Sequence, residues 1–238
     1  MANTDICQDL ELPQILREQL NILYSQVPAT ACDNCGHCCQ LSEEERKRGW
    51  VTMYPLYALE YLNILEFVRT QLPEGRREEL LRFHEEWPLR CPFRDDSLPG
   101  CIIYPVRPLV CRTYGVLGPE EIEEAVRRFG GGMPAGWIET FRRWEGSLVC
   151  PRVRVLEPEK LPSYMEGRIH FRYMTLLEKL NERVCLPQED RREEFRRISG
   201  RERVIRWTWG GFNALVRSPD GWFREEFPGY WRTSSLAR

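Results

Sequence analysis

Apolar residues recur at helical spacing in several stretches of the chain. In residues 11–27 they fall three or four positions apart, and Pro28 follows; the apolar positions are Leu12, Ile15, Leu16, Leu20, Leu23 and Val27. This pattern predicts an amphipathic helix that ends before the proline. The same criteria predict further helices at residues 55–71, 74–87, 119–129, 137–146 and 162–184.

Residues 91–117 interrupt the helical pattern with closely spaced helix breakers: Pro92, Pro99, Gly100, Pro105, Pro108 and Gly115. This density of proline and glycine cannot sustain a helix. We therefore expect Cys91, Cys101 and Cys111 to lie on loops or very short strands.

The last part of the chain changes character. Residues 204–209 and 212–217 are rich in β-branched and aromatic side chains, and the turn sequence S-P-D-G follows at residues 218–221. This arrangement predicts a small hairpin or meander. We expect a mainly α fold in which residues 1–155 form a helical domain with irregular cysteine-rich metal-binding loops. Residues 156–238 are predicted to form a C-terminal extension that is helical and partly β.

Composition is typical of a folded protein, because 42% of the 238 residues are hydrophobic and 29% are charged. Charges interrupt every apolar run before it reaches the roughly 18 residues that a membrane span requires. Residues 1–17 lack the basic and apolar regions of a secretory signal. We therefore expect a soluble, cytoplasmic protein that does not engage a membrane.

The net charge of −2 argues against a general nucleic-acid binder, which relies on basic residues that displace counterions from phosphate. Residues 191–238 differ from the rest, because they hold eleven arginines against six acidic residues, interleaved with aromatic side chains. This Arg- and aromatic-rich tail is a candidate docking segment for a protein partner.

Ten cysteines are the dominant feature of the sequence. Cytosolic thiols stay reduced, so metal ligation is favoured over a disulfide framework. Four of them form a C-x-x-C-x-x-C-C motif: Cys32, Cys35, Cys38 and Cys39. Thiolates spaced in this way can wrap one inorganic centre, as they do in bacterial ferredoxins. Because adjacent side chains usually diverge, we expect Cys38 and Cys39 to serve different metals or different corners of a polynuclear centre.

Four further cysteines complete a set of eight candidate ligands: Cys91, Cys101, Cys111 and Cys150. Eight thiolates suffice for two centres with four ligands each, either two 4Fe-4S clusters or two zinc sites. The triple C-x-x spacing favours iron-sulfur over zinc. His37 is an alternative ligand within the first motif, whereas the isolated Cys7 and Cys185 are expected to be ordinary thiols.

The ordered combination of C-x-x-C-x-x-C-C, C-P-F and C-I-I-Y-x-x-R-P-x-x-C-R-x-Y-G resembles the YkgJ-type cysteine-cluster family. Its members are described as zinc- or iron-chelating proteins and are linked to the flagellin lysine N-methylase group. The resemblance covers about residues 30–152 and implies metal or iron-sulfur binding through the first seven cysteines of the set. Cys150 matches only as a less closely patterned downstream cysteine.

Four side chains of the second motif are candidate cofactor-binding residues: Tyr104, Arg107, Arg112 and Tyr114. Four thiolates around a zinc ion or an oxidised cluster leave a net charge near −2, which nearby donors must offset. We expect these residues to balance that charge and to stiffen the loop. Orientation of a substrate is the alternative.

The sequence thus predicts a metal-binding protein with two cysteine-ligated centres. Two 4Fe-4S clusters would give it an electron-transfer or redox role. Zinc would instead make the sites structural elements of a partner or assembly module, because thiolates filling all four positions leave none for an activating water. A third alternative, which the resemblance alone suggests, is a protein-modifying enzyme of the lysine N-methylase type.

Overall fold

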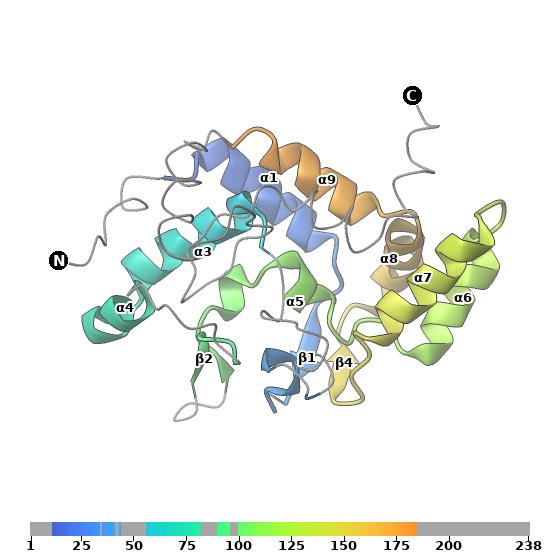
Figure 1. Cartoon of the computed structure of the whole chain (residues 1–238), viewed down its shortest axis with the longest axis horizontal. Helices are drawn as coiled ribbons and strands as arrows, with labels where there is room; N and C mark the ends of the chain where they lie inside the picture. The colour runs from blue at the N-terminus through green and yellow to red at the C-terminus, as the bar shows by residue number, and fades with distance from the viewer. Residues whose placement is uncertain are drawn as a thin grey trace. The chain divides into compact units, whose positions relative to one another are not determined.

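The computed structural model describes residues 11–33, 35–40, 43, 56–81, 90–95 and 100–184 (Figure 1). These residues fall into two compact units. The first unit comprises the described residues of Met1–Arg17, Asn34–Pro108 and Leu180–Trp222. The second comprises those of Glu18–Asp33, Leu109–Lys179 and Phe223–Arg238. The predicted domain boundary at residue 155 stays a prediction.

Helices dominate the described residues, which confirms the mainly α fold expected from the sequence. The α-helices are α1 (Gln14–Ser25), α3 (Ala58–Gln71), α4 (Glu74–Leu81), α5 (Leu109–Thr113), α6 (Pro119–Phe129), α7 (Ala135–Gly146), α8 (Leu161–Ile169) and α9 (Arg172–Asn181). Three 3-10 helices are present in the same ranges: η1 (His37–Cys39), η2 (Tyr104–Val106) and η3 (Pro158–Lys160). The strands form antiparallel pairs, β1 (Thr30–Cys32) with β4 (Val153–Val155) and β2 (Arg94–Asp95) with β3 (Gly100–Cys101).

The core of the first unit centres on α3. Apolar side chains of α3 and of the two residues before it are almost completely buried. They are Leu56, Tyr57, Leu59, Tyr61, Leu62, Ile64, Leu65 and Val68. At the start of the helix, the backbone N–H of Tyr57 donates to the Glu60 carboxylate at 3.4 Å. The side chain of Asn181 accepts a hydrogen bond from the backbone N–H of Leu59 at 3.1 Å. The side chains of Glu60 and Asn181 therefore accept hydrogen bonds from backbone N–H groups at the start of α3, which have no partner within the helix.

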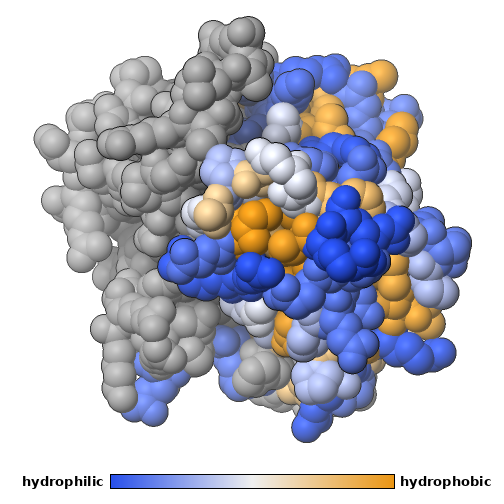
Figure 2. All heavy atoms as spheres, turned by 90° about the vertical axis from the view of Figure 1, so that its right-hand side faces the viewer, coloured by the Kyte–Doolittle hydropathy of each residue, from blue (hydrophilic) through white to orange (hydrophobic). Residues whose placement is uncertain are grey.

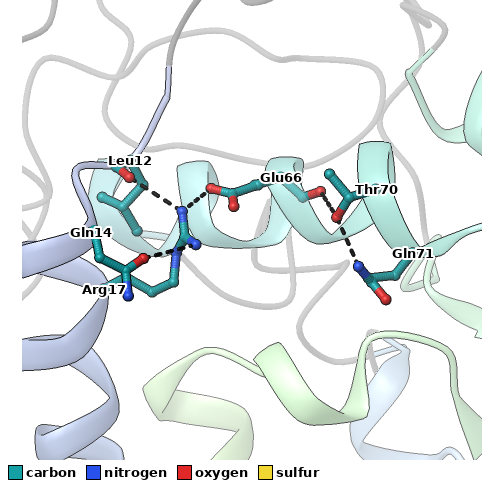
Figure 3. A network of polar contacts seen from close by, with 6 residues as sticks. All are labelled: Leu12, Gln14, Arg17, Glu66, Thr70 and Gln71. Carbon is teal, nitrogen blue, oxygen red and sulfur yellow. Dashed lines mark hydrogen bonds and ion pairs between the residues drawn. The ribbon is translucent and has the colours of Figure 1, made fainter.

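Arg17 joins the first turn of α1 to the middle of α3 (Figure 3). Its guanidinium donates to the Glu66 carboxylate, to the carbonyl of Leu12 at 3.2 Å and to the side chain of Gln14 at 3.3 Å. The Thr70 hydroxyl donates to the Glu66 carbonyl one turn further along α3, at 2.8 Å. Arg17 thus ties the start of α1 to α3, the helix at the centre of this unit's core.

The second unit is built on α6, α7 and α8, which lie side by side (Figure 1). Pro119 opens α6 at its first turn, and the Glu121 carboxylate accepts from the backbone N–H of Gly118 at 2.9 Å. Figure 2 looks onto the side that carries these helices and shows small apolar patches among strongly hydrophilic groups. The apolar faces are turned inward, where Ile122, Phe141 and Tyr164 are buried.

The predicted helix over residues 162–184 is wrong in its length, because two helices, α8 and α9, occupy this range. Phe171 adopts a left-handed backbone conformation with φ of 57°, which an α-helix cannot contain. The backbone N–H of Phe171 donates to the Arg168 carbonyl at 3.0 Å and closes α8. Cys111 also differs from its prediction, because it lies in the short helix α5, directly after Pro108 sets the helical backbone angle.

Other sequence predictions agree with the described residues. The bounds of α6 match the predicted range, and α1, α3 and α7 lie within two or three residues of theirs. Cys101 lies on a two-residue strand and Cys91 on a loop, as expected. The predicted hairpin over residues 204–217, the Arg- and aromatic-rich tail, Cys7 and Cys185 lie outside the described residues.

None of the helices in the described ranges combines the length and the apolar character that crossing a bilayer requires.

Candidate metal centre

The C-x-x-C-x-x-C-C loop turns sharply at Gly36. This glycine has a φ of 73°, in the left-handed region that glycine tolerates best. The 3-10 helix η1 follows, and the backbone N–H of Cys39 donates to the Gly36 carbonyl at 2.9 Å. The tight winding brings the Sγ atoms of Cys38 and Cys39 to 3.8 Å from each other. These adjacent side chains therefore converge, whereas the sequence predicted that they diverge.

The backbone around Cys91 pairs with the end of this loop. The backbone N–H of Cys91 donates to the Cys39 carbonyl at 2.7 Å, and Gln40 and Arg90 form an antiparallel bridge. The Cys91 thiol also shares a hydrogen bond with the Cys39 side chain. Two segments about fifty residues apart in the chain are thus held together at their cysteines.

The β2–β3 hairpin brings Cys101 into the same region. Arg94 on β2 is the register partner of Cys101 on β3, and the Ile102 N–H donates to the Phe93 carbonyl at 3.0 Å. The charge on Cys39 acts electrostatically on the Cys101 thiol. In the first unit, Cys39 therefore interacts with Cys38 and Cys91, and its charge reaches Cys101.

The electrostatics of this group favour a thiolate at Cys39. Hydrogen bonding with Cys38 and then with Cys91 lowers the pKa of Cys39 to about 3, with a further contribution from Arg94. Burial raises the pKa of Cys101, and the charge of Arg107 works against that rise. Thiolates are the form in which cysteine binds metals, so the donor chemistry fits a metal centre.

Arg94 is a residue that the sequence analysis missed. Its guanidinium occupies the space in which any side chain at position 36 would lie, and it donates to the Cys39 thiolate. Its contact follows from the register of the β2–β3 hairpin, which is a tertiary feature. The only available signal was an arginine directly after the C-P-F motif.

Three segments of the second unit that carry cysteines meet near a glycine turn. Cys32 on β1 pairs with Val153 on β4, and the Val153 N–H donates to the Cys150 carbonyl at 3.3 Å. Gly115 follows α5, the helix that contains Cys111, and a side chain at Gly115 would collide with Val153 and approach the Cβ of Cys150 to 3.1 Å. Segments that carry Cys32, Cys111 and Cys150 thus meet near this turn. Cys35 belongs to the first unit.

The four predicted cofactor-binding residues divide between the units. In the first unit the Arg107 guanidinium stacks on the Tyr104 ring, 3.6 Å from its centroid. In the second unit Arg112 stacks on Tyr24 at 4.1 Å, and Tyr114 is half-buried directly after α5. The charge of Arg107 lowers the pKa of Cys101, and its predicted role in balancing the charge of a metal centre stays a prediction.

All eight candidate cysteines are half-buried. Within the described residues, the His, Cys, Asp and Glu side chains form no group of three or more that is already arranged to hold a metal ion. The described part of His37 does not include its side chain.

A comparison with protein families identifies the cysteine-rich segment. Residues 31–128 match the CxxCxxCC family model, described as "Putative zinc- or iron-chelating domain". The match includes seven of the eight candidate cysteines and ends before Cys150. No curated protein and no solved structure matches this chain. Residues 31–128, fewer than half of the 238 residues, are thus similar to a family described by zinc or iron chelation.

Proposed function

We propose that the first unit binds one zinc or iron ion through Cys38, Cys39, Cys91 and Cys101. The observation that carries this proposal is the 3.8 Å separation between the Sγ atoms of Cys38 and Cys39. Four sulfurs placed about 2.3 Å from a central zinc ion lie about 3.8 Å apart along each edge of the tetrahedron. Two adjacent thiols of this chain already have that spacing.

The spacing favours a single ion over a 4Fe-4S cluster at these two residues. Each thiolate of a cubane cluster binds a separate iron, so its sulfurs lie further apart than those around one ion. The C-x-x-C-x-x-C spacing supports the cluster as a second candidate. Metal analysis separates the two, because the cluster also contains inorganic sulfide.

Charge supports the same donor set. Four thiolates around a divalent ion carry a net charge of about −2. Arg94 donates to Cys39, and the charge of Arg107 acts on Cys101, so two cations favour thiolates in the first unit. With all four positions filled by sulfur, the ion has no place for water, and the centre holds the loop and the hairpin together.

The three cysteines of the second unit, Cys32, Cys111 and Cys150, are the proposed ligands of a second ion. Their support is the packing of Gly115 against Val153 and Cys150. Cys150 lies outside the segment that matches the family model, so the proposed second centre includes a ligand from beyond that segment.

Anaerobic purification of the full chain, followed by metal and sulfide analysis, tests the proposal. We expect about two ions per chain, no inorganic sulfide, and loss of one ion in Cys39→Ser and of the other in Cys150→Ser. Brown protein with sulfide equal to iron would replace this proposal with the cluster. Folded protein without metal would contradict both.

A further inference from the structure

Arg94 is fixed in place by two independent features of the first unit. Its backbone is paired with Cys101 across the β2–β3 hairpin. Its guanidinium fills the space over Gly36, where the absent side chain leaves room for it. The position of the charge therefore depends on the hairpin and on the glycine turn together.

The guanidinium also donates to the Cys39 side chain, next to Cys38 and Cys91. A fixed cation beside a thiolate centre stabilises the more negative state of that centre more strongly. Four thiolates carry about −2 with a divalent ion and about −1 with a trivalent ion. Arg94 thus interacts more favourably with the divalent form.

We propose that Arg94 is a positioning residue that tightens the binding of a divalent ion and, in the iron-loaded centre, favours ferrous over ferric iron. This inference rests on the proposed function of the first unit. The redox change is the addition of one electron to ferric iron, supplied by a one-electron mediator, and all four thiolates stay bound.

Zinc affinity tests the role of the charge. Arg94→Gln removes the cation, and we expect zinc to bind about 10- to 100-fold more weakly in competition with a chromogenic chelator. Arg94→Lys keeps a charge and should recover most of the affinity. Arg127→Gln is the control, because Arg127 pairs with Glu124 on the exposed face of α6. Equal zinc affinity in Arg94→Gln and the unsubstituted chain would overturn the inference.

Gly36→Ala tests the placement of Arg94 without changing Arg94 itself. The added methyl group would displace the guanidinium, so zinc affinity should fall. Gly132→Ala is the matched control, because Gly132 has a similar φ of 80° and open space around its Cα. Both alanines introduce backbone strain, but only the first moves a charge. Equal zinc affinities in the two variants would contradict the proposed placement.

A mediated redox titration of the iron-loaded chain gives the second readout. Arg94→Gln should have a more negative ferric/ferrous potential than the unsubstituted chain, and Arg94→Lys an intermediate one. An unchanged potential in Arg94→Gln overturns the inference but leaves the proposed function standing. An unsubstituted chain that binds neither zinc nor iron overturns the proposed function instead.

Discussion

The carboxylate of Glu145 on α7 accepts two hydrogen bonds from the Arg168 guanidinium on α8, one of them from Nε at 2.9 Å. The two side chains are only 3% and 6% exposed. Burial raises the pKa of Glu145, and the charge of Arg168 opposes that rise. The pair joins two helices of the second unit through groups that water does not reach.

Removing one partner of this pair should destabilise the protein strongly. Glu145→Gln leaves the Arg168 charge buried without a counterion, so we expect a loss of about 3–5 kcal/mol in the free energy of unfolding. Urea denaturation followed by circular dichroism measures it. The double variant Glu145→Leu/Arg168→Met should lose less, because it removes both charges. Glu123→Gln at the exposed pair with Arg142 is the control and should change little.

Gly115→Ala should destabilise the second unit. The backbone at Gly115 has a φ of 74°, which costs alanine about 1–2 kcal/mol. The new Cβ would also lie 2.6 Å from a methyl carbon of Val153, and such overpacking costs a further 1–3 kcal/mol, roughly. Gly132→Ala shares the strain but not the collision. Equal losses of unfolding free energy in the two variants would contradict the packing described here.

The contribution of Glu157 to stability should depend on pH. Hydrogen bonds from Lys160 and from the Ala29 N–H hold the pKa of Glu157 below its ordinary value of 4.5. A lowered pKa means that the folded state favours the carboxylate, so this contribution is present above pH 4.5 and is lost as the pH falls through the lowered pKa. Urea denaturation of the unsubstituted chain and of Glu157→Gln should therefore give a larger difference at pH 7 than in strong acid. A constant difference would exclude this linkage.

Bound zinc should stabilise the folded chain by mass action. At a free zinc concentration about 100 times the dissociation constant, the gain is about 2.7 kcal/mol. Thermal unfolding with and without zinc measures it, and a chelator should reverse the shift. Cys91→Ser should show a smaller shift, because it removes a proposed ligand. An identical shift in this variant would point to zinc bound elsewhere.

Helices α1, α6 and α7 were predictable because each buries one apolar face, whose residues recur at helical spacing in the sequence. The short helix α5 was not, because it lies among prolines and glycines. The break between α8 and α9 was not, because the left-handed backbone at Phe171 leaves no mark in the apolar pattern.

The candidate site was predictable in part. Cysteine spacing predicted eight candidate thiols, and the match to the family model confirms the resemblance to a cysteine-cluster family. The set of eight ligands stays a prediction. The convergence of Cys38 and Cys39 depends on the winding of η1, and the contact of Arg94 with Gly36 depends on hairpin register. Both are tertiary properties, which residue spacing does not encode.

The backbone N–H of Ala29 donates to the Glu157 side chain across 128 positions of the chain. Beside it, β1 pairs with β4, so the sheet of the second unit closes a very long loop. Closing such a loop costs conformational entropy before the strand pairing contributes any stabilisation, and this cost slows folding. During synthesis, β1 leaves the ribosome long before its partner strand exists. This sheet must therefore be completed late in biogenesis, after most of the described residues have emerged.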